Sequence, residues 1–269
     1  MPRKIDISDN TSPDGMTQQG MSPGLKHAFD SMSPGLKHAF DSMSPGLKPA
    51  FDPTANHIEI GIDEAGRGPL FGRLYVAAVV LPKGFYHKDI KDSKKLSDKK
   101  IRQMSTLIKE NALAWSIQYI EHDTIDEINI RQAVFRGMHA AIKETMTELS
   151  EKLPQQDEYL LLVDGNDFKP YMTYHDETST YKPVPYQTIE HGDAIYMTIA
   201  AASILAKCAR DRYIEELCDH YPQLIERYNL QKNKGYGTKQ HLEGIQRWGI
   251  TQWHRKTYAR CDSATMNPI

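Results

Sequence analysis

An 11-residue repeat near the amino terminus most constrains how this chain can fold. The segment MSPGLKHAFDS occupies residues 21–31, recurs unchanged at 32–42, and returns with two proline substitutions at 43–53. Each copy contains a Pro-Gly pair, which breaks a helix and favours a turn, and only one Leu and one Phe as large apolar groups. Burial of so little apolar surface does not offset the entropy lost on ordering. We therefore expect residues 1–56 to be a disordered, low-complexity extension and the fold to lie within residues 57–269. A second interpretation is that the repeat docks a partner and is copied for avidity.

Residues 57–269 suffice for one domain with a sizeable core. The apolar pattern predicts strands over 57–62, 74–81, 112–120, 158–163 and 184–189, and helices over 98–110, 123–149, 194–218 and 238–248. Consecutive strands followed by alternating helices predict an α/β fold, in which helices cover the faces of a mixed sheet.

Composition excludes several classes of protein. The chain has 33 Lys and Arg against 35 Asp and Glu, which excludes a histone-like polycation but allows local basic patches. No apolar run approaches the roughly 18 residues of a membrane helix, and the first residues lack the apolar stretch of a signal peptide. Three cysteines are too few for a disulfide framework or a zinc knuckle. We expect a cytoplasmic protein with reduced thiols and no membrane partner.

The most informative segment reads GIDEAGRGP at residues 61–69. A strand ends there in two adjacent carboxylates, Asp63 and Glu64, and the chain then enters a glycine-rich turn. Two neighbouring acids are costly when both are ionised and dehydrated, and a hard divalent cation relieves that repulsion. The glycines allow a ligand to approach the backbone closely. Taken alone, the pair is explained equally well by a solvated surface turn.

Two further acids occupy similar positions. Asp164 follows the apolar strand at 158–163, at the edge of an α/β sheet where ligands gather. Asp193 lies just before an Ala-rich helix and follows His191, which is a candidate metal ligand or a surface residue. The alternatives are an Asp-Gly turn for Asp164 and a helix N-cap for Asp193.

Basic residues accompany these acids. Ser203 and Lys207 are four residues apart and share one face of the predicted helix. Basic clusters lie at 83–102 and at 227–260, and the second is interleaved with aromatic residues. Such clusters are typical of a solvated face, but together with a carboxylate cluster they favour an enzyme that acts on nucleic acid.

Five blocks resemble, in order and spacing, the type 2 ribonuclease H family, also called ribonuclease HII. They are GIDEAGRGP at 61–69, DSKKL at 92–96, VDG at 163–165, the segment from GDA through AASI to RD at 192–211, and GYGT at 235–238. The resemblance covers residues 57–255. It implies a ribonuclease H-like fold, with a five-stranded mixed sheet flanked by helices and a C-terminal helical portion that helps to hold the substrate.

The resemblance also implies the chemistry. Four acids, Asp63, Glu64, Asp164 and Asp193, would bind two divalent cations, Mn²⁺ or Mg²⁺, and catalyse in-line hydrolysis of a phosphodiester. The substrates would be RNA–DNA hybrids and duplex DNA with embedded ribonucleotides, cut on the 5′ side to leave a 3′-hydroxyl and a 5′-phosphate. We expect the protein to act as a monomer.

Seven further positions are implied as substrate contacts. The Gly66, Arg67 and Gly68 backbone would read the 2′-hydroxyl that separates RNA from DNA, and Tyr236 would contact the sugar at the RNA–DNA junction. Lys94, Ser203 and Lys207 would contact phosphates or support the residues that do so.

The sequence departs from the family pattern at three positions. His191 stands where family members usually have Lys, and Phe71 and Arg73 replace smaller residues after the glycine turn, where we expect them to alter the approach of the DNA strand. Two alternatives remain: a non-catalytic hybrid-binding protein, and a type 3-like ribonuclease H. A binder of polyanions gains nothing from a carboxylate cluster, and the repeats are too short to form the N-terminal domain of type 3 enzymes.

Overall fold

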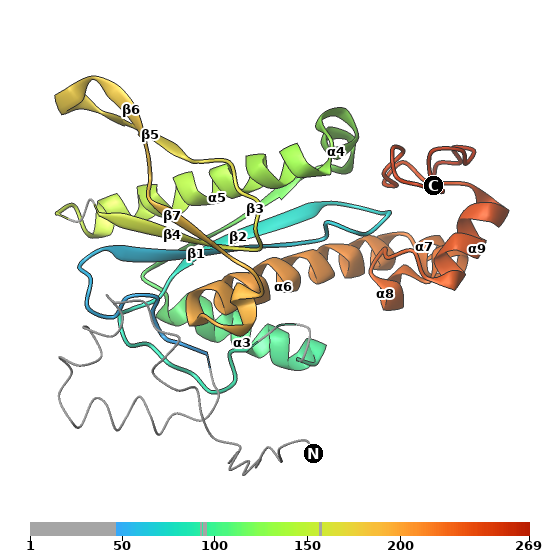
Figure 1. Ribbon diagram of the computed structural model, residues 1–269. Coiled ribbons are helices and arrows are strands. Elements are labelled where there is room, and N and C mark those ends of the chain that lie inside the picture. Colours follow the sequence, from blue (N-terminus) through green and yellow to red (C-terminus); the bar gives the residue numbers. More distant parts are fainter. Residues whose placement is uncertain (1–46, 92, 94–95, 156–157) are drawn as a thin grey trace, which may run out of the picture. The chain divides into compact units, whose positions relative to one another are not determined.

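A five-stranded mixed sheet in the order β3-β2-β1-β4-β7 organises the computed structural model, which describes residues 47–91, 93, 96–155 and 158–269 (Figure 1). Its strands are β1 (Ile58–Ala65), β2 (Leu74–Val80), β3 (Ala114–Ile120), β4 (Tyr159–Asp164) and β7 (Tyr186–Ile189). β1, β2 and β3 pair antiparallel, whereas β4 runs parallel to both β1 and β7. The predicted five-stranded mixed sheet is confirmed.

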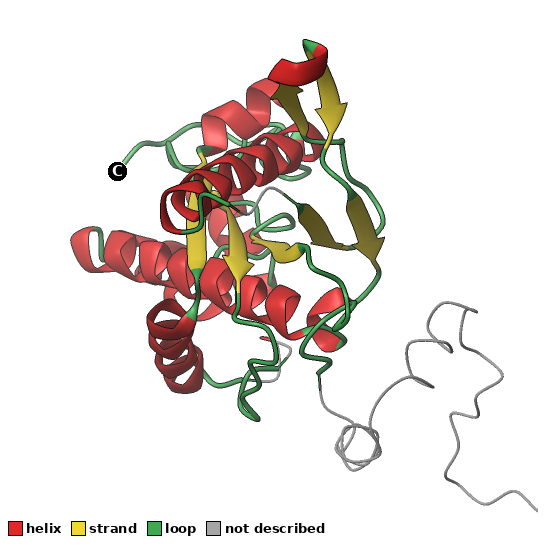
Figure 2. Cartoon of the chain, turned by 90° about the vertical axis from the view of Figure 1, so that its left-hand side faces the viewer, coloured by secondary structure: helices red, strands yellow, loops and turns green. Residues whose placement is uncertain are grey.

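Helices cover both faces of the sheet (Figure 2). One face carries α3 (Asp98–Asn111) and α6 (Met197–His220), and the other carries α5 (Ile130–Lys152), which follows the short α4 (His122–Ile128). Beyond the end of α6 lie α7 (Gln223–Tyr228), α8 (Leu230–Asn233) and α9 (Lys239–Trp248). Within this described part of the chain, none of the helices is both long and apolar enough to cross a membrane.

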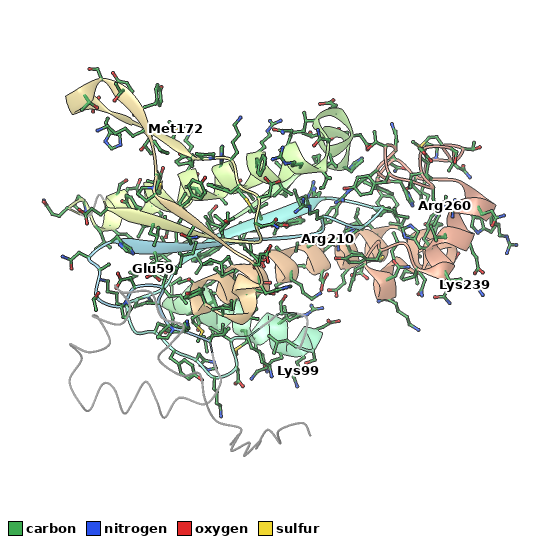
Figure 3. All side chains as sticks on the ribbon, viewed as in Figure 1. Glu59, Lys99, Met172, Arg210, Lys239 and Arg260 are labelled. Atoms are coloured by element: carbon green, nitrogen blue, oxygen red, sulfur yellow. The ribbon has the colours of Figure 1, made fainter. Side chains whose placement is uncertain are left out.

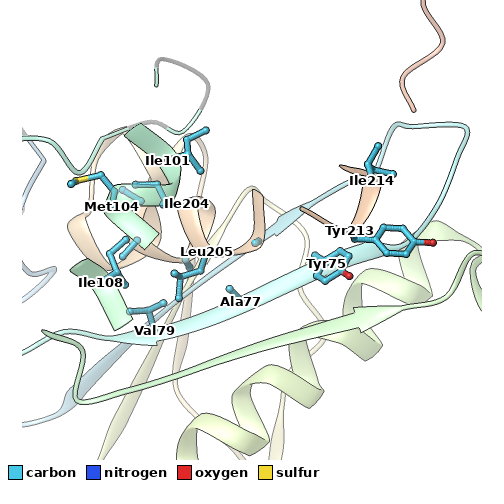
Figure 4. Packing of buried hydrophobic residues seen from close by; sticks show 14 of the residues in the cluster. Tyr75, Ala77, Val79, Ile101, Met104, Ile108, Ile204, Leu205, Tyr213 and Ile214 are labelled. Carbon is cyan, nitrogen blue, oxygen red and sulfur yellow. The ribbon is translucent and has the colours of Figure 1, made fainter. Parts of the chain in front are cut away.

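Strand β2 shows why the sheet needs helices on both faces. All of its residues are buried. Tyr75, Ala77 and Val79 pack beneath α3 and α6, as Figure 4 shows, and the alternate residues pack against α5. Side chains of a strand alternate between the two faces, so a strand that is apolar throughout is stable only between two covering layers.

Helix α6 lies close to β1 because Gly61 has no side chain. A Cβ atom at this position would lie 2.3 Å from the carbonyl carbon of Thr198 and 2.6 Å from the backbone nitrogen of Ile199. Real Cβ atoms do not approach backbone atoms so closely, so only glycine fits here. The contact holds the first turns of α6 against the strand that carries Asp63.

The structure differs from the sequence prediction in two elements. The helix expected over 123–149 is divided into α4 and α5 at Asn129, which has a φ of 66° and whose side chain accepts a hydrogen bond from the Gln132 N–H. A two-stranded hairpin of β5 (Met172–His175) and β6 (Thr180–Pro183), linked by the 3₁₀ helix η3 (Asp176–Thr178), was not predicted.

The folded body begins at residue 47 rather than at the predicted residue 57. Leu47 is buried in the core, and the backbone of Lys48 forms hydrogen bonds with Ile195 and Met197. The expected disorder is therefore wrong for the last part of the third repeat copy, because the body supplies the apolar partners that the repeat lacks. The expectation for residues 1–46 falls outside the described residues.

Candidate active site

Two of the predicted acids are neighbours because of strand register. β1 and β4 run parallel, and Ile62 pairs with Val163, so Asp63 and Asp164 are the next residues on strands about 4.8 Å apart. Ile62 and Val163 pack on the α5 side of the sheet. Because side chains alternate along a strand, both acids face the opposite side, toward α6.

A third acid reaches the same place from the turn before α6. Asp193 lies in the 3₁₀ helix η4 (Gly192–Ala194), is 3% exposed, and donates its backbone N–H to Asp164 Oδ1 over 3.3 Å. A Cβ atom on Gly192 would also lie 3.3 Å from that oxygen, so this turn packs directly on Asp164. His191, at the start of the turn, is exposed and has a φ of 57°.

The environment of these acids opposes their ionisation. Burial raises the pKa of Asp63 well above its usual range, and the charges of Glu64 and Asp164 raise it further, whereas a hydrogen bond from Ser203 lowers it. Burial also raises the pKa of Glu64; the Arg67 guanidinium, 3.7 Å away, opposes this, and Asp164 adds to it. Three carboxyl groups therefore lie within electrostatic range of one another, and a bound cation would relieve their repulsion.

The chemistry of these donors fits a hard divalent cation. Carboxylate oxygens are the ligands that Mg²⁺ and Mn²⁺ prefer, and neutralising the repulsion among Asp63, Glu64 and Asp164 favours binding. Among the described residues, however, no three Asp, Glu, His or Cys side chains are already placed so that together they could coordinate one metal ion. Like charges repel at short range, so we expect the side chains to rotate toward a cation when it binds.

The glycine turn is held from the inside by Arg255, which the sequence analysis missed. Its fully buried guanidinium donates hydrogen bonds to the carbonyl oxygens of Gly66 at 2.7 Å, Arg67 at 3.1 Å and Gly72 at 3.0 Å. In a trans peptide the C=O and the following N–H point in opposite directions. The inward carbonyls of Gly66 and Arg67 therefore direct the N–H groups of Arg67 and Gly68 outward.

A second buried arginine fixes the shape of this turn. Gly66 has a φ of 98°, and a Cβ atom there would lie 2.3 Å from Arg210 Nε. Arg210 extends from α6 (Figure 3) and donates to the carbonyl oxygens of Phe71 at 3.3 Å and Lys234 at 2.8 Å. Burial lowers its pKa to about 10. Arg210 thus connects the glycine turn to the C-terminal helices.

The structure places Tyr236 beside the glycine turn. A Cβ atom on Gly68 would lie 3.6 Å from the Tyr236 ring, and the Leu70 N–H donates to the Gly235 carbonyl over 2.9 Å. The Tyr236 side chain remains half exposed. An aromatic ring therefore lies beside the outward N–H groups of the turn.

Lys94, Ser203 and Lys207, which were expected to contact phosphates or to support the residues that do so, have three different environments. Lys94 lies outside the described residues, but its neighbour Ser93 is buried and shares a 3.0 Å hydrogen bond with the Ser203 hydroxyl. Ser203 is buried too and hydrogen-bonds both Ser93 and Asp63, so it links the Ser93 segment to the acid on β1. Lys207 is partly exposed, and its ammonium pairs with Asp211 over 2.6 Å.

The two bulky residues after the glycine turn belong to the packing of the fold. Phe71 is fully buried, edge-on to the His254 ring at 5.0 Å, so its side chain has no surface that could contact a DNA strand directly, and its effect on the approach of that strand stays a prediction. The Arg73 guanidinium lies 4.1 Å from the Tyr119 ring and 4.6 Å from the Tyr213 ring. Phe71 packs on the C-terminal segment at Trp253 and His254, whereas Arg73 lies between β3 and α6 and pairs with Glu121 over 2.6 Å.

Comparison with known proteins agrees with this geometry. The family model for ribonuclease HII matches residues 60–262. A ribonuclease HII from Parabacteroides distasonis is 44% identical over 201 residues, which cover 75% of this chain and 89% of the relative. A ribonuclease HII from Chlorobium luteolum is 43% identical over 203 residues, which cover 74% of this chain and 86% of the relative.

Solved structures share the fold. The ribonuclease H2 from Pyrococcus horikoshii matches with a TM-score of 0.57 and 21% identity, over 76% of this chain and 95% of that protein. A Bst-RNase HIII in complex with Mn²⁺ matches with a TM-score of 0.56 and 16% identity, and the match covers 77% of this chain and 69% of that protein. These neighbours confirm the ribonuclease H-like fold. The family model and the relatives above 40% identity show that this chain belongs to the ribonuclease HII family.

Proposed function

We propose that this chain is an endonuclease that hydrolyses the RNA strand of RNA–DNA hybrids and nicks duplex DNA on the 5′ side of embedded ribonucleotides. Membership of the ribonuclease HII family supports ribonuclease H activity. The observation that carries the finer proposal is the juxtaposition of Asp63, Glu64 and Asp164, in which burial and then the neighbouring negative charges raise the pKa values of Asp63 and Glu64. A carboxylate cluster of this kind suits metal-dependent hydrolysis at phosphorus.

Asp63, Glu64, Asp164 and Asp193 are the residues proposed to hold two Mg²⁺ or Mn²⁺ ions. When bound, such ions supply activation of a water molecule and charge neutralisation at the departing 3′ oxygen. The chain keeps the acids ready as ligands. The Asp193 N–H orients the Asp164 carboxylate, and the hydrogen bond from Ser203 favours the ionised form of Asp63.

Selectivity for RNA is proposed to come from the backbone of the glycine turn. The N–H groups of Arg67 and Gly68 face outward and can donate to the oxygen of a 2′-hydroxyl, the group that DNA lacks. A site that hydrogen-bonds a substrate hydroxyl rejects the analogue without it far better than an apolar pocket does. The half-exposed ring of Tyr236, beside Gly68, is positioned to pack on the adjoining sugar.

The assay is nicking of an end-labelled DNA duplex that contains one ribonucleotide, with Mg²⁺ or Mn²⁺ present. We expect a nick directly 5′ of the ribonucleotide, with 3′-hydroxyl and 5′-phosphate ends. Asp63→Asn should abolish cutting but retain duplex binding, whereas Asp219→Asn, an exposed acid on α6, should cut as the parent does. Cutting by Asp63→Asn at the parental rate would show that the site assignment is wrong.

The same assay separates the two alternatives. A non-catalytic binder would retain the duplex and leave it intact under every metal condition. A type 3-like ribonuclease H would cut a continuous hybrid but leave the single ribonucleotide uncut. The family match to ribonuclease HII over residues 60–262 favours the type 2 activity.

A further inference from the structure

The third repeat copy is docked on the folded body beside the start of α6. The Lys48 N–H donates to the Ile195 carbonyl over 2.7 Å, and the Lys48 carbonyl accepts from the Met197 N–H over 2.8 Å. The preceding residue, Leu47, is 7% exposed and belongs to the main core. Figure 1 shows this segment, at the blue end of the described chain, running to the first strand.

The end of the same copy is held by one acid and one aromatic ring. The N–H groups of Phe51 and Asp52 donate to the Glu59 carboxylate over 2.9 and 2.8 Å, and Glu59 is marked in Figure 3. The Phe51 ring lies 5.6 Å from that of Tyr196. Docking therefore uses two apolar side chains of the repeat, Leu47 and Phe51, together with backbone groups and the Lys48 ammonium, which lies 5.7 Å from the Tyr196 ring.

The two upstream copies carry the same docking groups. Leu25 and Phe29 of the first copy, and Leu36 and Phe40 of the second, have the spacing of Leu47 and Phe51. The backbone donors and acceptors are common to any sequence, and every copy ends the motif with Asp.

We propose that Glu59, Ile195, Tyr196 and Met197 form a docking site that any of the three copies of one chain can occupy, so that the repeats are interchangeable. The site binds an extended segment with the pattern Leu-Lys-x-Ala-Phe-Asp. The third copy is the occupant in the structure, and the other two are competitors supplied by the same chain.

The third copy is favoured over the others for two reasons. Pro49 biases Lys48 toward the extended backbone that the site requires, whereas the other copies have His27 and His38 at that position. In addition, the connection from the second copy to β1 is about threefold longer, which lowers its effective concentration about fivefold. The second and first copies are therefore minor occupants.

Exchange among the copies would keep the chain next to Asp193 hydrogen-bonded to a docked segment at all times. The docked segment bonds to Ile195 and Met197, two and four residues beyond Asp193. Loss of the third copy by mutation would leave substitutes, and this redundancy gives the near-identity of the copies a physical role.

The test uses urea unfolding of three full-length variants. The first variant, Leu47→Ser/Phe51→Ser, disables the third repeat copy. The second variant disables the first and second copies by the equivalent changes Leu25→Ser, Phe29→Ser, Leu36→Ser and Phe40→Ser. The third variant combines all six substitutions. We expect the second variant to unfold at the parental midpoint. The docking equilibrium constant of the first should fall at least about fivefold, because the longer connection alone accounts for that factor and the second copy also lacks the proline of the third, and docking should be lost entirely in the third. Equal midpoints for the first and third variants would overturn the proposal.

A peptide provides a direct second measurement. A synthetic peptide of residues 32–42 should bind the six-fold variant and raise its unfolding midpoint, whereas the same peptide with Leu36→Ser and Phe40→Ser should not. No binding of the parental peptide would also overturn the proposal. The midpoint of Leu47→Ser/Phe51→Ser should be independent of protein concentration; a rise with concentration would show that a second chain supplies the copy and would contradict exchange within one chain.

Discussion

Replacement of Arg255 by lysine is expected to destabilise the fold through the glycine turn. The guanidinium is fully buried and donates to the carbonyls of Gly66, Arg67 and Gly72 and to the Tyr258 hydroxyl at 3.1 Å. These acceptors lie in different directions around a planar group. The Arg255→Lys variant keeps the charge but loses the fork of donors that reaches all of them.

The magnitude follows from the carbonyls that lose their partner. An ammonium at the end of a lysine can reach one of the three carbonyls, and the Arg67 carbonyl also accepts from the Tyr258 hydroxyl over 2.9 Å, so at least one buried acceptor, the Gly66 or the Gly72 carbonyl, remains unsatisfied. This acceptor costs about 1–3 kcal/mol out of a typical stability of about 5–15 kcal/mol. Burial already lowers the pKa of Arg255, and lysine retains a buried cation, so the substitution offers no compensating gain.

The assay is urea unfolding followed by circular dichroism. The matched control is Arg136→Lys at an exposed position on α5, which should stay within about 0.5 kcal/mol of the parent. Nicking at a single ribonucleotide should also weaken in Arg255→Lys, because the turn loses the contacts that direct its N–H groups outward. A free energy of unfolding for Arg255→Lys equal to that of Arg136→Lys would refute the bracing role.

Three further predictions concern the same site. Burial and neighbouring charges raise the pKa of Asp63, so the folded protein keeps the proton of this carboxyl group to a higher pH than the unfolded chain does. Folding stability therefore falls as the pH rises above about 4, the pKa of Asp in the unfolded chain. In EDTA at pH 7, Asp63→Asn should therefore unfold at higher urea than the parent and show a flatter pH profile; a lower midpoint would count against the electrostatic argument. Gly66→Ala should lower the free energy of unfolding by more than the roughly 1–3 kcal/mol of backbone strain, because its Cβ would lie 2.3 Å from Arg210 Nε. The control Gly84→Ala, at a φ of 74° with open space around it, should cost the strain alone. Equal shifts in melting temperature for the two variants would contradict this. Tyr236→Ala should reduce cutting at a single ribonucleotide more than cutting of an all-RNA hybrid, and equal losses in the two rate assays would refute its role at the junction.

Much of the sheet could be predicted because its strands are short apolar runs. β2 and β4 are buried on both faces, so the sequence marks them clearly. The division of the long helix at Asn129 could not be predicted, because apolar residues continue with helical spacing through the break. The hairpin of β5 and β6 was missed because its residues are largely exposed and each strand has only four residues, too few for a clear alternating pattern.

The acids of the site were recognised from local sequence, but their support was not. Asp63 and Asp164 end apolar strands, and the register that makes them neighbours follows from a parallel sheet. Arg255, in contrast, is more than 180 residues from the glycine turn that it holds. No local pattern encodes a contact at that separation, and an isolated arginine looks like a surface cation.

The start of the folded body shows the same limitation. The repeat is too poor in apolar groups to fold alone, and from that fact the sequence predicts disorder through residue 56. Leu47 and Phe51 are nevertheless packed, because the body provides the surfaces that they cover.

Whether the four acids share one pair of divalent ions can be measured by anomalous X-ray scattering from crystals of the protein with its nicked product and Mn²⁺. We expect two Mn²⁺ peaks, each about 2.0–2.2 Å from carboxylate oxygens of Asp63, Glu64, Asp164 and Asp193. Mn²⁺ bound away from these oxygens, or any one of the four carboxylates remaining about a nanometre from the ions, would contradict this expectation.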